Sequence, residues 1–198
     1  NFPSWPDFKL FSCWTILTII IIFNDFQKID KLFLNSFLKD PFSSFFKILI
    51  ILSSLFVLSS SQKFIKDNNL DKFEYPIIIL LSILGMFFMV SSNDLILFYL
   101  GLELQSLSLY ILAAIDRDNL RSTEAGIKYF VLSALSSGLL LYGCSLLYGF
   151  AGSTNFEVIA NELNPKNYGA VFAIVFILVG LAFKVSAVPF HMWTPDVY

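Results

Sequence analysis

Three ionisable residues lie deep inside long apolar runs of the sequence: Glu103, Lys128 and Lys184. A charged side chain at bilayer depth costs about 2.5–3.5 kcal/mol on insertion scales, so each position calls for a reason. Glu103 follows the start of its run at Asp94 by nine residues. At 1.5 Å per helical residue this is about 14 Å, close to the middle of a membrane. Three such groups on successive runs favour a relay that passes protons between buried side chains.

A polar stripe surrounds the first of these residues. Tyr99, Glu103, Ser106 and Tyr110 recur at helical spacing in an otherwise apolar run, so they share one helix face. Such a face is expected to point into a helix bundle or a water-filled cavity. In this setting a lysine is a suitable proton carrier, because burial disfavours its charged form and a nearby carboxylate favours it.

The last apolar run predicts a broken helix. Lys184 and Ser186 are followed by Pro189, which has no backbone N–H, and then by His191. A lysine beside a helix break is a recurring arrangement in ion-conducting membrane proteins. We therefore predict that Glu103, Lys128, Lys184 and His191 form the relay and that Pro189 marks the break.

Structural explanations compete with this hypothesis. Lys128 could extend its amine to the near membrane surface, or Glu103 and Lys128 could form a purely structural buried pair. His191 could be a hydrogen-bonded histidine at the membrane interface. In the helix that carries Lys128, small residues four apart (Ser133 and Ser137, Ala134 and Gly138) predict close approach of a neighbouring helix.

The composition predicts how these residues are positioned. Of the 198 residues, 57% are hydrophobic and 14% are charged. In soluble domains roughly 45–50% of residues are apolar and about 25% are charged. The mean hydropathy of the chain is +0.74. The chain is therefore expected to be an all-α, polytopic membrane protein. The apolar runs are continuous rather than alternating, which favours helices over a barrel. Six spans are predicted, at about 8–24, 42–60, 76–91, 94–115, 122–149 and 169–188, with a short interfacial helix at Phe156–Leu163.

Several classes of protein are excluded. The net charge of −2 leaves no basic face for nucleic acid. Cys13 and Cys144 lie in apolar runs and are expected to be small packing residues. No glycine-rich phosphate loop and no cysteine–histidine cluster is present, so we expect no metal, no bound cofactor and no redox centre in this chain.

Loop charges predict the orientation. If the spans alternate, one side carries six cations (Lys9, Lys63, Lys66, Lys72, Arg117 and Arg121), and the other carries four (Lys28, Lys31, Lys39 and Lys166). By the positive-inside rule the six-cation side faces cytoplasm or matrix. The 23 phenylalanines and the excess of lysine over arginine are typical of an AT-rich genome, such as that of an organelle.

Three strings resemble a known family: NDLILFYLGLELQSLSLYILAA (93–114), STEAGIKYFVLSALSSGLLLYGCSLLYG (122–149) and LVGLAFKVSAVPFHMWTPDVY (178–198). They are similar to subunit 2 of respiratory complex I, whose bacterial counterpart is the antiporter-like subunit N. Mrp-type cation/proton antiporter subunits share the broader architecture. The resemblance covers about residues 74–198, whereas residues 1–73 match only as apolar helices.

The resemblance implies roles for individual residues. The family's buried glutamate falls on Glu103, the lysine of its next helix on Lys128, and the central lysine of its broken helix on Lys184. Residues 74–198 would then be the first of two inverted repeats, incomplete at the broken helix, preceded by N-terminal helices in 1–73.

The resemblance also implies partners and a location. The chain would be a proton-translocating subunit of NADH:ubiquinone oxidoreductase in the mitochondrial inner membrane, with lipids and the other membrane-arm subunits as its partners. NAD, FMN, iron–sulfur clusters and ubiquinone would be bound elsewhere in the complex. Two explanations are open for the missing second half of the subunit. Either the subunit is split and a second polypeptide carries the other half, or this sequence is a fragment of a longer chain. An Mrp-type antiporter subunit and a non-conducting scaffold remain as alternatives.

Overall fold

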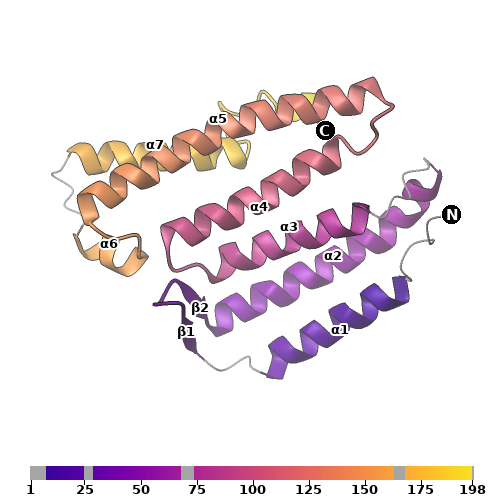
Figure 1. The fold of residues 1–198 in the computed structure, drawn as a ribbon, viewed down its shortest axis with the longest axis horizontal. Coiled ribbons are helices and arrows are strands. Elements are labelled where there is room, and N and C mark those ends of the chain that lie inside the picture. Colours follow the sequence, from indigo (N-terminus) through magenta and orange to yellow (C-terminus); the bar gives the residue numbers. More distant parts are fainter. Residues whose placement is uncertain (1–7, 25–28, 68–73, 163–167, 198) are drawn as a thin grey trace.

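The computed structural model describes residues 8–24, 29–67, 74–162 and 168–197 as a row of helices with one short hairpin (Figure 1). The helices are α1 (Phe8–Asn24), α2 (Pro41–Asp67), α3 (Glu74–Ser91), α4 (Leu95–Ala113), α5 (Leu120–Ala151), α6 (Phe156–Glu162), α7 (Tyr168–Lys184) and α8 (Thr194–Val197). The antiparallel strands β1 (Asp30–Leu32) and β2 (Phe37–Lys39) form the hairpin.

The predicted helical membrane fold is confirmed. Among the described residues, α2 to α5 are long and apolar enough to cross a membrane, and α7 is a shorter apolar helix of 17 residues. The predicted interfacial helix is α6. The hairpin lies in the segment whose lysines, Lys31 and Lys39, were counted as loop charges. Three other cations used for orientation (Lys28, Lys72 and Lys166) lie outside the described residues.

The last long helix ends earlier than predicted. α7 stops at Lys184, five residues before Pro189 and four before the expected end at residue 188. The chain turns because Ser186 adopts a left-handed backbone conformation, with φ of 57°. The backbone N–H groups of Val185, Ser186 and Ala187 donate to carbonyls in the last turn of α7. The proline is therefore not the cause of the break, and the lysine lies at the end of the helix itself.

Glycines allow the closest helix contacts. A Cβ added to Gly180 of α7 would lie 2.6 Å from the Leu140 Cβ of α5, and one added to Gly143 would lie 2.9 Å from the Ala173 carbonyl oxygen. Ser133 and Ser137 are buried in the bundle as expected. Ala134 and Gly138 are exposed, and nothing lies within 4 Å of a Cβ added to Gly138. Only one of the two predicted small-residue pairs therefore faces a helix of this chain.

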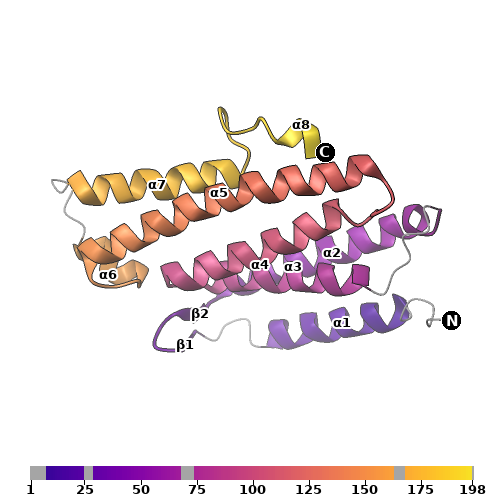
Figure 2. The same cartoon turned by 45° about the horizontal axis from the view of Figure 1, so that its top comes forward.

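The connections gather at two ends of the bundle. The hairpin, the α3–α4 turn and α6 lie at one end, and the 114–119 connection between α4 and α5 lies at the other (Figure 1). At the first end the Asn93 side chain donates to the Asn35 carbonyl, and the Asp94 carboxylate accepts from the Thr154 hydroxyl and caps α4. These bonds hold the hairpin and the start of α6 against α4. Figure 2 shows α7 beside only part of α5, so that the C-terminal end of α7, which is Lys184, lies partway along α5.

Candidate functional site

The end of α7 lies against the polar stripe of α4. The Lys184 Nζ donates to Glu103 Oε1 at 3.2 Å, to Ser106 Oγ at 3.1 Å and to Tyr110 Oη at 3.1 Å. These three residues belong to the stripe predicted from helical spacing, so the stripe does face the bundle interior. The structure thus pairs the buried glutamate with the lysine of α7.

The hydrogen-bond count of this site matches a charged amine. An ammonium group has three N–H donors and no acceptor. Lys184 has three acceptors in three different side chains, and Ser106 remains an acceptor because its own hydroxyl proton goes to the Leu102 carbonyl at 2.8 Å. A neutral amine has only two N–H groups and one lone pair, so after loss of a proton one hydroxyl partner must donate to the amine or lose its bond. Protonation of Lys184 and the arrangement of its partners are therefore linked.

A third helix completes the site. Ser137 of α5 donates to Glu103 Oε1 at 2.5 Å, so this oxygen accepts both a hydroxyl and the ammonium group. Ser137 was predicted only as a small residue that allows close packing. Its second role could not be found from the sequence, because α5 carries several serines and their faces depend on packing.

The ion pair is mostly removed from solvent. The side chains of Lys184 and Glu103 are 10% and 21% exposed. At this burial the Coulomb attraction is screened far less than at a surface, but both groups have also lost hydration. Such a pair is weak support for stability and is more typical of a functional site.

An aromatic cluster covers one side of the lysine. The Tyr110 ring packs edge-on against Tyr129 at 4.6 Å, and Tyr129 stacks on Trp193 at 4.6 Å between centroids. Trp193 also stacks on Phe183, next to Lys184. The segment after the α7 break therefore folds back over α5 and separates the amine from the surroundings on this side.

Two predicted relay residues lie apart from this cluster. Lys128 pairs with Glu124 at 2.8 Å one turn earlier in α5, and its side chain is 43% exposed. Along α5 it is nine residues, or about 14 Å, from the Ser137 that contacts Glu103. The direct partner of Glu103 is Lys184, so the structural pair considered for Glu103 and Lys128 is not the pair observed. His191 and Pro189 lie exposed in the turns after α7.

No cluster of three or more metal-ligating side chains occurs in the described part of the chain. Cys144 is buried in the core formed by α4, α5 and α7, in keeping with its predicted packing role, and the side chain of Cys13 lies outside the described residues. The chemistry that the site supports is transfer of protons among an amine, a carboxylate and hydroxyl groups.

Residues 92–198 match the family model described as "NADH:quinone oxidoreductase/Mrp antiporter, TM". This match covers more than half of the chain. The chain belongs to this family. The site described above lies wholly within the matched residues, and this antiporter family includes both of the protein classes suggested by the sequence motifs.

Curated relatives of this chain include bacterial proteins. The chain is 61% identical over 184 residues to NADH-quinone oxidoreductase subunit N of Pelagibacter ubique, covering 92% of this chain and 39% of that protein. It is 51% identical over 189 residues to subunit N of Rhodobacter capsulatus, covering 94% of this chain and 40% of that protein. The chain thus spans about two fifths of the length of these relatives.

Solved structures of the family share the fold. A chain of respiratory complex I from Thermus thermophilus with bound aureothin superposes with a TM-score of 0.77 at 31% identity, covering 93% of this chain and 39% of that one. A chain of the Mrp complex from Dietzia superposes with a TM-score of 0.76 at 23% identity, covering 96% and 37%. The second likeness concerns the fold alone.

Proposed function

We propose that this chain is part of a proton-translocating membrane-arm subunit of an NADH:quinone oxidoreductase, and that Lys184 and Glu103 are its central proton-carrying pair. The proposal depends on one observation: the Lys184 amine, at the end of α7, donates hydrogen bonds to Glu103, Ser106 and Tyr110 inside the helix bundle. The identity to subunit N proteins supports the choice of complex. Residues 74–198 would form the first repeat of the subunit, and residues 1–73 the preceding helices.

In this proposal the carboxylate controls the amine. While Glu103 is charged it favours the ammonium form of Lys184, and a proton that arrives on Glu103 removes that charge and favours release from the amine. The two groups share a hydrogen bond, so a change of charge on one acts directly on the other. Lys128 and His191 would be later members of the relay, reached through water or through movement of the chain. NAD, FMN, iron–sulfur clusters and ubiquinone would bind in other subunits of the complex.

The chain would work among other membrane-arm subunits and lipids, with the rest of the subunit supplied by further sequence or by a second polypeptide. The identity of the membrane is a separate part of the proposal. The subunit N proteins of Pelagibacter ubique and Rhodobacter capsulatus are bacterial and favour a bacterial plasma membrane, and they do not support the mitochondrial inner membrane that the AT-rich composition suggested.

The test is substitution of Lys184 by Met in the intact complex. Met preserves the bulk of the side chain and removes the titratable amine, so the complex should assemble and pump fewer protons. Lys63→Met, at an exposed lysine near the end of α2, is the matched control and should pump normally. Normal pumping by an assembled Lys184→Met complex would defeat the proposal.

Two other functions remain distinguishable by experiment. An Mrp-type antiporter subunit has the same fold, and proton exchange driven by a cation gradient without NADH would favour it. A non-conducting scaffold would show full NADH-driven pumping after neutralisation of Glu103, Lys128 and Lys184 together.

A further inference from the structure

An apolar pocket lies between α1, α2 and α3. Its volume is about 500 Å³, within the range of ligand pockets, roughly 300–1,000 Å³. Leu80 and Leu84 of α3, which are 47% and 44% exposed, border it on the outside of the bundle. Its inner wall consists of buried side chains from all three helices: Thr15, Ile51, Ser54 and Ile83. The pocket therefore extends from the lipid-facing surface into the bundle, and none of the described residues that line it belongs to the candidate proton site.

The inside of this pocket offers few hydrogen bonds. The Thr18 hydroxyl donates to the Thr15 carbonyl at 2.8 Å, and the Ser54 hydroxyl donates to the Ile51 carbonyl at 2.8 Å. Both hydroxyl protons are thus used within their own helices, and most of the other lining side chains are hydrocarbon. A buried water needs two to four polar partners, whereas a hydrocarbon chain needs none. The pocket therefore suits an apolar occupant.

Two polar groups lie at the end of the pocket nearest the hairpin. Lys47 precedes Ile51 by four residues in α2, and it therefore lies on the pocket-lining face of that helix. Ser91 follows Phe87 by four residues in α3 and lies on the corresponding face. The Ser91 residue is 1% exposed, and its hydroxyl has no hydrogen-bond partner in the part of the chain that the structure describes.

The Lys47 amine lacks a direct counter-charge. Among the described residues no carboxylate lies within ion-pair distance of it, and its contact is the Phe37 ring of β2, 5.0 Å from Nζ to the ring centroid. The charges that act on it, Lys39 and Asp40, have opposite signs and offset one another. Phe37 also forms a backbone bridge with Ser92, so the amine and the end of α3 meet at the same residue of the hairpin.

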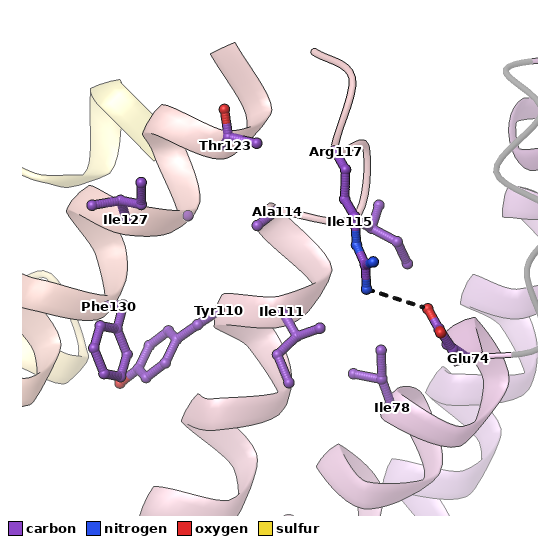
Figure 3. Close-up of a pocket in the computed structure, with 11 residues that line it drawn as sticks. Glu74, Ile78, Tyr110, Ile111, Ala114, Ile115, Arg117, Thr123, Ile127 and Phe130 are labelled. Carbon is purple, nitrogen blue, oxygen red and sulfur yellow. Dashed lines mark ion pairs between the residues drawn. The ribbon is translucent and has the colours of Figure 1, made fainter. Parts of the chain in front are cut away.

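A second cavity of similar volume lacks this combination (Figure 3). It measures about 460 Å³ and lies between the start of α3, the end of α4 and the start of α5. The two charges at its edge, Arg117 and Glu74, face one another with 3.9 Å between Nη2 and Oε2. The Tyr110 hydroxyl in its wall accepts from Lys184. The polar groups of that cavity thus already have partners within the chain.

We propose that the pocket between α1, α2 and α3 binds one acyl chain of an anionic phospholipid, whose phosphate pairs with Lys47. An ammonium group needs a negative charge and acceptor oxygens, and a phosphate supplies both. A water held by the ester oxygens gives the buried Ser91 hydroxyl its acceptor. Ile51 and Ser54 lie four and seven residues beyond Lys47, or about 6–11 Å along α2, within the roughly 15 Å that one leaflet's chains span. This site does not depend on the proposed role of Lys184.

Photo-crosslinking in the intact complex tests the site. The purified complex is reconstituted in proteoliposomes that contain a trace of either phosphatidylglycerol or phosphatidylcholine, each with a diazirine midway along one acyl chain. Crosslinked peptides are then mapped by mass spectrometry. We expect crosslinks on the α3 wall of the pocket, at Leu80, Ile83 and Leu84. They should be about fivefold more frequent with phosphatidylglycerol, the preference that one lysine confers near a membrane surface.

Two pairs of variants separate the headgroup from the chain. Lys47→Met should remove the preference for phosphatidylglycerol and leave the crosslinks of phosphatidylcholine unchanged, whereas Lys63→Met, at an exposed lysine near the other end of α2, should keep the preference. Leu84→Trp should fill the pocket from outside and reduce the crosslinks of both lipids. Leu81→Trp, at a position 43% exposed that does not line the pocket, should not.

Three results would overturn the proposal. Equal crosslinking of the two lipids, or a preference that survives Lys47→Met, would show that Lys47 does not hold the headgroup. Absence of crosslinks from the α3 wall, as when a helix of a neighbouring subunit fills the pocket, would exclude the lipid chain altogether.

Discussion

Removing one partner of the Glu103–Lys184 pair should destabilise the subunit more than removing both. Loss of one member of a buried pair leaves an uncompensated charge and costs about 3–5 kcal/mol, whereas replacing both is often close to neutral. Glu103 keeps 21% exposure and its bond from Ser137, so about 3 kcal/mol is expected for Lys184→Met. The double variant Glu103→Gln with Lys184→Met should regain most of the stability that Lys184→Met loses. The coupling free energy from this double-mutant cycle should therefore be about 2–3 kcal/mol, the upper range for residues in contact.

The chain contains a matched control pair. Lys128 and Glu124 are closer, at 2.8 Å, but their side chains are 43% and 57% exposed. A coupling of only about 0.3–0.5 kcal/mol is therefore expected for Lys128→Met with Glu124→Gln. If the closer but more exposed pair shows the smaller coupling, burial and not distance sets the strength of the interaction.

The assay is the thermal midpoint of the subunit in the purified complex, where 1 kcal/mol corresponds to about 2–4 °C for a chain of this size. Lys184→Met should lower the midpoint by about 6–12 °C, and the control variants by less than about 2 °C. Additivity of Glu103→Gln and Lys184→Met within about 0.5 kcal/mol would refute the reasoning. Glu103→Gln and Lys128→Met should be additive in stability because the residues are far apart, whereas non-additive pumping would reveal a longer relay between them.

Two further predictions concern topology and packing. A cysteine replacing Asp118 should react with an impermeant thiol reagent only from the cytoplasmic or matrix side. A cysteine replacing Glu157 should react only from the opposite side. Reaction of the Asp118 cysteine from the opposite side would show that the predicted orientation is wrong. Gly180→Ala should cost about 1–3 kcal/mol by overpacking against Leu140, while Gly138→Ala should be neutral or stabilising by up to about 1 kcal/mol, as measured by thermal midpoint. Equal effects of the two alanines would contradict the packing of α5 on α7.

Much of the fold could be predicted from the sequence, because a helix that crosses the hydrocarbon core of a membrane must be long and apolar. The predicted spans coincide with α1 to α5 and α7 to within a few residues at most ends. The hairpin could not be predicted in the same way. Its turn places Phe33, Leu34 and Asn35 at positive φ, without the Asn-Gly or Asp-Gly pair that usually indicates such a turn.

The site was partly predictable for a related reason. Helical periodicity placed Glu103, Ser106 and Tyr110 on one face, and the structure places that face against Lys184. Periodicity does not say which neighbouring helix covers a face. The pairing of Glu103 with Lys184 depends on how α4 and α7 come together, which the sequence alone did not determine. Lys128 and Glu124 are four residues apart in α5, so their pairing follows from helical spacing.

The end of α7 at Lys184 has an electrostatic consequence. Aligned peptide dipoles give the C-terminus of a helix the equivalent of about half an elementary negative charge, and this charge does not titrate. Lys184 is attracted by it and Glu103 is repelled, so the two partners are not equivalent. If the carboxylate is lost, the amine still has a fixed counter-charge. If the amine is lost, the carboxylate faces a negative helix end. The glutamate is thus the member of the pair whose charge can change at less cost to the structure.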